Sequence, residues 1–122
     1  MRTHKDLDAW KLSVEWVVLI YQLTSTFPKE EVFGLTNQIR RAAVSIPSNI
    51  AEGAARNSNK ELIQFLHISL GSQQELDTQF LIAKKLEYLT EDQYNEINIK
   101  IETVGKLLNG LIKYLKTKWQ II

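Results

Sequence analysis

The chain has 122 residues, a formal net charge of +1 and no cysteine. This length suits one domain with a modest core, so we predict that residues 1–122 form a single domain. The lack of cysteine excludes disulfides, thiolate metal sites and cysteine nucleophiles, and the near-neutral charge provides no global field that would recruit nucleic acid. The longest apolar run, residues 16–21, is far shorter than the roughly 20 residues that cross a bilayer, so we expect a cytoplasmic protein with no membrane partner.

The first predicted element is a helix over residues 6–26. Apolar residues repeat there at spacings of three and four, which is the period of a helix face. They form two neighbouring stripes, one of Leu7, Trp10, Val14, Val17 and Tyr21 and one of Leu12, Trp16, Leu19, Ile20 and Leu23. The helix is expected to stop at Phe27-Pro28, because the residue before a proline avoids the α region.

A second helix is predicted over residues 33–54. Its apolar stripe consists of Leu35, Ile39, Ala43, Ile46 and Ile50. Pro47 lies inside this helix, where it removes one amide donor and clashes with the carbonyl of Ala43, so we expect a kink. Gly53 is expected to loosen the C-terminal end of the helix.

The third and fourth predicted helices each begin with a capping box. Ser58 and Glu61 open the third helix, and Thr90 and Gln93 open the fourth. Gly71, in the third helix, predicts the close approach of a neighbouring backbone. Connections of about three to eight residues make successive helices antiparallel. The predicted fold class is therefore all-α: an antiparallel up-down-up-down four-helix bundle with a kinked second helix.

The first and fourth helices carry more apolar surface than one bundle core needs. A helix that is apolar all round is buried on both sides, and large exposed apolar patches mark interfaces. We therefore predict a homo-oligomer joined through these two helices. The predicted interface residues are Trp16, Leu19, Ile20, Ile99, Ile112 and Trp119. This prediction depends on those side chains lying at the surface of a single subunit.

No catalytic residue, cofactor or metal site is predicted. His4 and His67 are the only histidines, and neither follows a glutamate at the three-residue spacing of di-iron bundles. The helix serines have no histidine placed to activate them, and the chain carries no glycine-rich phosphate motif. We expect a protein that is not an enzyme; a less favoured interpretation takes Glu52 and Glu75 as paired carboxylates.

A polar cluster on the second and third helices is a candidate site. Its predicted members are Gln38, Ser45, Asn49, Glu52 and Glu75. Two interpretations stay open: a hydrogen-bonded network that fixes helix register around Pro47, or a pocket for a small ligand or a partner segment. Glu52 and Arg56 are four residues apart, in the orientation that favours an ion pair.

Basic residues form the last candidate site. The residues proposed for polyanion contact are Arg40, Arg41, Arg56, Lys106 and Lys113. A solvated helix face is the simpler interpretation of these charges, but an oligomer would repeat a weak patch into a ring that binds phosphates.

Several strings resemble a known bacterial family. They are Asp6-Leu7 with Trp10, Phe27-Pro28 with Glu31, Phe33-Gly34-Leu35 with residues 38–42, residues 45–53, and Gly71-Ser72 with Glu75-Leu76. The chain resembles the 23S rRNA-intervening-sequence proteins over nearly its whole length, most specifically in residues 45–53. The resemblance implies a four-helix bundle that assembles as a homopentamer and has no known catalytic activity.

A related group, the accessory proteins of diversity-generating retroelements, is similar in fold. Its members form basic pentamers that engage a reverse transcriptase and nucleic acid, and the present chain departs from them in being nearly neutral. Ser69 and Gln73 stand where the family has small or apolar residues, which is expected to alter the local packing.

From these features we predict a non-enzymatic, homo-oligomeric interaction protein. Its leading role is that of an adaptor whose partners, besides itself, are RNA or a nucleic-acid-processing protein. The alternative is a protein-partner scaffold or a small-ligand-binding bundle with no nucleic-acid role, which would use the pocket around Asn49 and Glu52.

Overall fold

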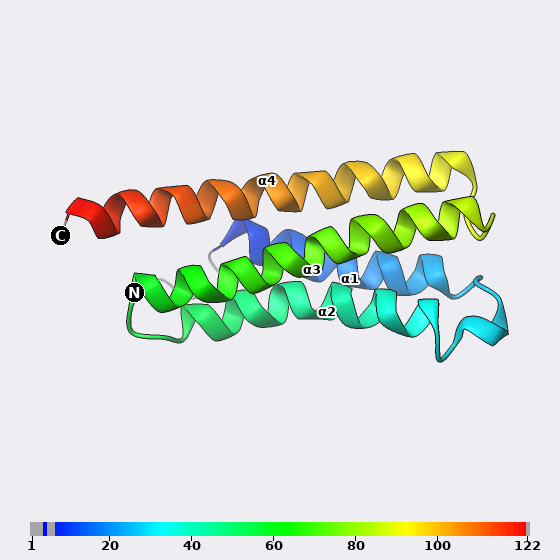
Figure 1. The fold of residues 1–122 in the computed structure, drawn as a ribbon, viewed down its shortest axis with the longest axis horizontal. Coiled ribbons are helices and arrows are strands. Elements are labelled where there is room, and N and C mark those ends of the chain that lie inside the picture. The colour runs from blue at the N-terminus through cyan, green and yellow to red at the C-terminus, as the bar shows by residue number, and fades with distance from the viewer. Residues whose placement is uncertain (1–3, 5–6, 122) are drawn as a thin grey trace.

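The computed structural model describes His4 and residues 7–121, except for the side chains of residues 119–121. The helices are α1 (Asp8–Thr24), the short 3₁₀ turn η2 (Lys29–Glu31), α2 (Leu35–Ala54), α3 (Asn59–Lys85) and α4 (Glu91–Ile121). The four long helices lie along a common axis, and the last turns of α4 project beyond the ends of α2 and α3 (Figure 1). The all-α prediction is confirmed for the described residues. The predicted start of the first helix at Asp6 lies outside them, and the kink at Pro47 stays a prediction.

The helices do not pack equally well against one another. The α2–α3 contact is the most extensive, followed by α3–α4 and α1–α2, whereas α1 touches α4 only sparsely. Within the described chain, α1 makes no contact with α3, and α2 makes none with α4, so these pairs lie on the diagonals of the bundle. The α1–α4 side is therefore the weakly closed side of the bundle.

The core contains large apolar side chains from all four helices. The members with almost no exposed surface are Ile20, Ile39, Ile46, Ile50, Leu66, Leu76, Phe80, Ile97, Ile101 and Leu108. Burying one such side chain contributes about 1.5–3 kcal/mol, so this set supplies most of the driving force for folding.

The buried face of α1 differs from both predicted stripes. It consists of Ala9, Ser13, Trp16, Ile20 and Thr24. The two hydroxyls are buried without cost because they donate to carbonyls of their own helix, Ser13 to Trp10 at 3.0 Å and Thr24 to Ile20 at 2.7 Å. The period of three and four was therefore right, and the second stripe contains the buried Trp16 and Ile20, whereas Val14 and Tyr21 of the first stripe lie at the surface.

Serine hydroxyls fix the register of α2 against α3. The Ser72 hydroxyl donates to Ser45 Oγ at 2.9 Å, and the buried Ser69 hydroxyl donates to the carbonyl of Ile46, also at 2.9 Å. These two bonds join α3 to α2 at Ser45 and Ile46, directly before Pro47. They support the structural interpretation of the predicted polar network.

Two glycines have roles that differ from the predictions. α2 continues through Gly53, where a Cβ would lie 2.7 Å from the Phe65 Cβ and 3.3 Å from the Leu62 carbonyl oxygen. Gly53 therefore permits the close approach of α3 rather than loosening the helix end. The close approach predicted at Gly71 is absent within the described subunit, because a Cβ there would meet no atom within 4 Å.

The buried polar side chain of Gln73 ties α3 to α4. Its amide donates to the carbonyl of Ile101 at 3.0 Å. Gly105 makes room for it, since a Cβ at that position would lie 2.7 Å from Gln73 Nε2. Ser69 and Gln73 are thus both held by buried hydrogen bonds, and a packing that differs from the rest of the family stays a prediction.

Local hydrogen bonds define the helix ends. Ser58 Oγ accepts from the Glu61 amide at 3.2 Å, which caps α3 as predicted. At the start of α4, Thr90 Oγ1 accepts from the Gln93 amide at 3.1 Å, and Gln93 Oε1 accepts from the Thr90 amide at 2.9 Å, which completes the second capping box.

Glu31 was not predicted as a cap, but it stabilises the start of α2. Its Oε1 accepts from the Leu35 amide at 3.1 Å, and its Oε2 accepts from the Tyr88 hydroxyl at 2.8 Å. The hydrogen bond from Tyr88, followed by that from the Leu35 amide, lowers the pKa of Glu31 below its ordinary value. The same pair raises the pKa of Tyr88.

Candidate functional site

The predicted polar cluster divides into two parts. Gln38, Ser45 and Glu75 line a shallow cavity of about 310 Å³ between α2 and α3, together with Arg41, Ala42 and Ser72. Asn49 borders this group, since its amide donates to the Ser45 hydroxyl at 2.9 Å and to the Ser45 carbonyl at 2.8 Å. Glu52 lies elsewhere, where it pairs with Arg56 at 3.1 Å as its spacing predicted.

The interpretation of Glu52 and Glu75 as paired carboxylates is wrong. Glu75 lines the cavity beside Arg41, whereas Glu52 is eleven residues farther along α2, or about 16 Å of helix. Two carboxyl groups that share one reaction must lie much closer together. The one structural basis for the enzymatic alternative is therefore absent from the described chain.

The five basic candidates do not form one patch. Arg40 is tied to α1, because its Nε donates to Thr24 Oγ1 at 3.0 Å and its guanidinium lies 4.5 Å from the centre of the Tyr21 ring. Arg56 pairs with Glu52 and stacks on the Phe65 ring at 4.9 Å. Arg40 thus has a structural role in the α1–α2 contact, which argues against its availability for a polyanion.

The remaining bases lie on diagonal helices. Arg41 is exposed on α2, and Lys106 and Lys113 are exposed on α4, which does not contact α2. The two lysines are seven residues apart and therefore share one face of α4. One subunit has two separate basic regions rather than a continuous positive surface.

The predicted interface residues are largely interior. Trp16 is 4% exposed, Ile20 is 0% exposed and Ile112 is 5% exposed, so these three side chains belong to the core and not to a surface patch. Leu19 is half-buried and Ile99 is 64% exposed, which leaves both available at the surface. The side chain of Trp119 lies outside the described residues.

Other apolar side chains take the surface positions. On α1, Val14, Val18 and Tyr21 follow one another at spacings of four and three, and Val18 is 57% exposed. Ile68 and Ile82 lie on one exposed face of α3, and Leu86 follows at its C-cap. Fourteen residues, or about 21 Å of helix that includes Ser72 and Glu75, separate Ile68 from Ile82. The apolar surplus predicted from the sequence therefore exists, but on α3 as well as α1 and through different residues. We call Val14, Val18 and Tyr21 the α1 stripe, and Ile68, Ile82 and Leu86 the α3 stripe.

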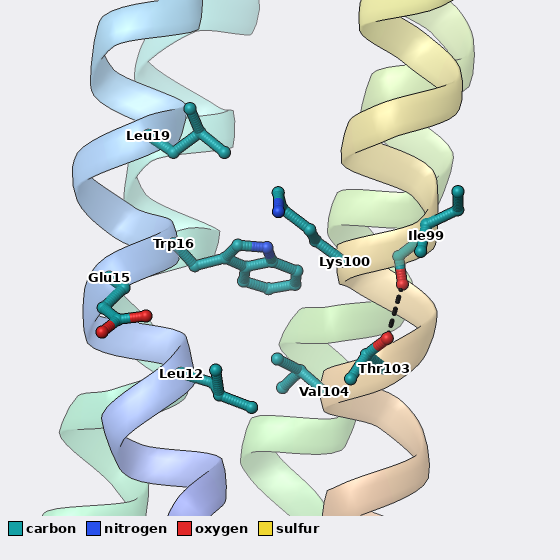
Figure 2. A pocket seen from close by; sticks show the side chains of 8 residues that line it. All are labelled: Leu12, Glu15, Trp16, Leu19, Ile99, Lys100, Thr103 and Val104. Atoms are coloured by element: carbon teal, nitrogen blue, oxygen red, sulfur yellow. Dashed lines mark hydrogen bonds between the residues drawn. The ribbon is translucent and has the colours of Figure 1, made fainter.

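A groove of about 280 Å³ separates α1 from α4. Its lining residues are Leu12, Glu15, Trp16, Leu19, Ile99, Lys100, Thr103 and Val104. Figure 2 shows the indole of Trp16 crossing from α1 toward α4, with its nitrogen-bearing edge turned toward Lys100, while the carboxylate of Glu15 stays over α1. The Thr103 hydroxyl is already used, because it donates to the Ile99 carbonyl at 2.9 Å.

The indole nitrogen of Trp16 lacks a hydrogen-bond partner. It is buried, and no acceptor lies within reach among the described residues. A buried donor without an acceptor costs about 1–3 kcal/mol. Thr36 Oγ1 and Gln79 Oε1 are also buried without a partner among the described residues, but only the Trp16 nitrogen belongs to a residue that lines the groove. The unpaired indole nitrogen could not be predicted from the sequence, because the groove depends on how far α1 and α4 separate.

The described residues offer neither a metal-binding cluster nor a membrane-spanning helix. The described residues contain no group of three or more histidine, cysteine or acidic side chains that could hold a metal ion. Among the described helices, none combines the length and apolar character needed to cross a membrane.

Comparison with known proteins places the chain in a family. The model of the 23S rRNA-intervening sequence proteins matches residues 5–110. The chain belongs to the 23S rRNA-intervening sequence protein family. This family assignment confirms the resemblance carried by residues 45–53, whereas the pentamer and the likeness to retroelement accessory proteins stay predictions.

A solved structure is similar over most of the family region. It is a protein of unknown function from the S23 ribosomal protein family of Bacteroides thetaiotaomicron VPI-5482. The two chains are 29% identical and superpose with a TM-score of 0.79, over 86% of the present chain and 95% of the other. Among curated proteins, no sequence matches the chain.

Proposed function

We propose that this family member is an up-down-up-down bundle that joins copies of itself into a closed ring and works as a non-enzymatic interaction module. One observation carries the proposal: two different apolar stripes lie exposed on α1 and α3, helices that do not contact each other within the subunit. Several exposed apolar side chains on one helix face are surface that assembly could bury.

Two unlike stripes favour a head-to-tail contact. The α1 stripe of one copy packs on the α3 stripe of the next, so each copy uses both surfaces. Such heterologous contacts generate a ring when the rotation between copies closes and a filament when it does not. A ring of five, the assembly that the family resemblance implies, is part of the proposal.

The test uses one charge in each stripe. Val18→Glu and Ile82→Glu place a carboxylate on exposed positions, so both variants should fold as single subunits that no longer assemble. Asn109→Glu, on an exposed position of α4 outside both stripes, is the matched control and should assemble normally. Sedimentation velocity then measures the particle mass of each protein.

A mixture of the two stripe variants decides the contact type. Each variant retains one intact stripe, so a head-to-tail interface forms a single contact and gives a particle of twice the 14.1 kDa subunit mass. A mixture that stays monomeric contradicts the head-to-tail contact. A wild-type particle of 14.1 kDa at micromolar concentration contradicts the assembly itself.

Contact with RNA is a second candidate function. It is favoured by Lys106, Lys113 and Lys116, which are all exposed on the part of α4 where the sequence has no acid after Glu102. A ring would repeat this lysine row around its axis. Binding through phosphates releases counterions, so affinity should fall steeply between about 50 and about 300 mM salt.

A labelled single-stranded uridine homopolymer provides the probe for this contact. We expect salt-sensitive binding that the double variant Lys106→Glu with Lys113→Glu abolishes and that Arg40→Ala leaves unchanged. Affinity that does not respond to salt would contradict the phosphate-contact account. An assembled ring that does not bind the polymer would remove the RNA function and leave the interaction module intact.

A further inference from the structure

The groove between α1 and α4 combines apolar walls with two hydrogen-bond donors that have no partner in the described subunit. We infer that it is a binding site for a small amphipathic anion, namely a carboxylate that carries a short apolar chain or a single ring. The inference does not depend on the self-assembly or on the RNA contact proposed above.

The size and lining of the groove set the apolar part of the ligand. The walls are formed by Leu12 and Leu19 from α1 and by Ile99 and Val104 from α4, with the Trp16 ring between them. Leu12 is 40% exposed and Ile99 is 64% exposed, so a ligand would remove apolar surface from water on both walls. The groove of about 280 Å³ exceeds the cavity of about 150 Å³ that can hold a benzene molecule.

The indole N–H requires an acceptor from outside the subunit. Trp16 is 4% exposed, and its nitrogen has no acceptor among the described residues. Figure 2 shows the nitrogen on the edge of the Trp16 ring that faces Lys100. A ligand oxygen that enters beside Lys100 would meet this donor once the flexible lysine side chain moves aside.

Lys100 determines that the acceptor carries a negative charge. This half-buried lysine forms no ion pair within the described chain, and Glu15, the acid on the opposite wall, does not lie within 4 Å of its ammonium group. Figure 2 shows Glu15 over α1, away from the middle of the gap. The two donors in the gap, an ammonium and an indole N–H, together match the two oxygens of a carboxylate.

The groove and the α1 stripe lie on different sides of α1. With 3.6 residues per turn, Leu12, Glu15 and Leu19 are displaced from Val14, Val18 and Tyr21 by about a third of a turn. Assembly through the α1 stripe therefore leaves the groove as a separate feature.

Octanoate is the probe that tests the site, with octanol as the uncharged ligand of equal chain length. The chain has three tryptophans, so its ¹⁵N-labelled form gives three indole N–H signals in an NMR spectrum. The Trp16 signal is identified by elimination with Trp10→Phe and Trp119→Phe. We expect octanoate to shift the Trp16 signal saturably, with a millimolar or tighter Kd, as the affinity per atom of small ligands suggests.

Lys100→Met removes the charge and keeps an apolar side chain, so it should preserve the fold and weaken octanoate binding about tenfold. Octanol should bind weakly to both proteins, with no difference between them. Lys11→Met is the matched control, because Lys11 is an exposed lysine of α1 that does not line the groove. The inference is overturned if the Trp16 signal does not shift saturably, or if Lys100→Met binds octanoate as tightly as the wild type.

Discussion

Alanine at two helix glycines should change stability in opposite directions. At Gly53, an added Cβ would lie 2.7 Å from the Phe65 Cβ, a distance that real side chains do not tolerate, and the Leu62 backbone oxygen blocks a simple shift. At Gly110, an added Cβ would meet no described atom within 4 Å. The two substitutions add the same methyl group to a helix, so they differ only in their surroundings.

The magnitudes follow from two known effects. Replacing an exposed helix glycine with alanine stabilises by about 0.5–1 kcal/mol, which is the whole expected effect of Gly110→Ala. Overpacking a closed site costs about 1–3 kcal/mol, so Gly53→Ala should be destabilised by about 0.5–2 kcal/mol after the helix preference is subtracted. The variants should therefore differ by at least about 1 kcal/mol.

Urea unfolding followed by circular dichroism measures this difference, at one fixed protein concentration because assembly would add to apparent stability. The slope of the unfolding free energy against urea concentration should be the same for both variants, whereas their unfolding midpoints should differ. Equal midpoints, or a Gly53→Ala protein more stable than the wild type, would show that the α2–α3 contact is looser than described.

Three further predictions concern single hydrogen bonds. The Tyr88 hydroxyl and the Leu35 amide lower the pKa of Glu31, so the ionised carboxylate adds stability that is lost as the pH falls below 4.5. Tyr88→Phe should therefore lose less stability than the wild type between neutral and acidic pH. Urea titrations at several pH values measure this difference. Thr90→Ala removes the α4 cap and should cost about 1 kcal/mol in thermal unfolding, whereas Thr90→Ser should be close to wild type. Ser69→Ala leaves the Ile46 carbonyl without this buried donor and should cost about 1 kcal/mol; no loss would show that the bond does not fix the α2–α3 register.

Features set by neighbouring residues were predictable from the sequence. Both capping boxes depend on residues three apart, and the structure confirms the complete box at Thr90. At Ser58 it confirms the cap on the Glu61 amide, while the Glu61 carboxylate accepts from the serine hydroxyl. The ion pair of Glu52 with Arg56 depends on one turn of helix and was also predictable. The four helices followed from the apolar period for the same reason.

Features set by distant residues were not predictable in the same way. On α1, Ser13 and Thr24 are buried and Val14 and Val18 are exposed, because hydroxyls that bond to their own helix enter a core at little cost. Apolar residues alone therefore predicted the helix and the buried Trp16 and Ile20, but not the polar members of the buried face. The groove at Trp16 depends on the sparse contact of α1 with α4, a spacing that no local pattern encodes.

The fit of Gln73 against Gly105 links two positions that are far apart in the chain. The amide of Gln73 fills the space that a side chain at position 105 would need. A substitution at one of these positions should therefore require a substitution at the other. A larger residue at 105 would clash with Gln73 unless a shorter residue replaced it, and a shorter residue at 73 alone would leave a cavity. In related sequences, a larger residue at position 105 should therefore occur together with a smaller residue at position 73.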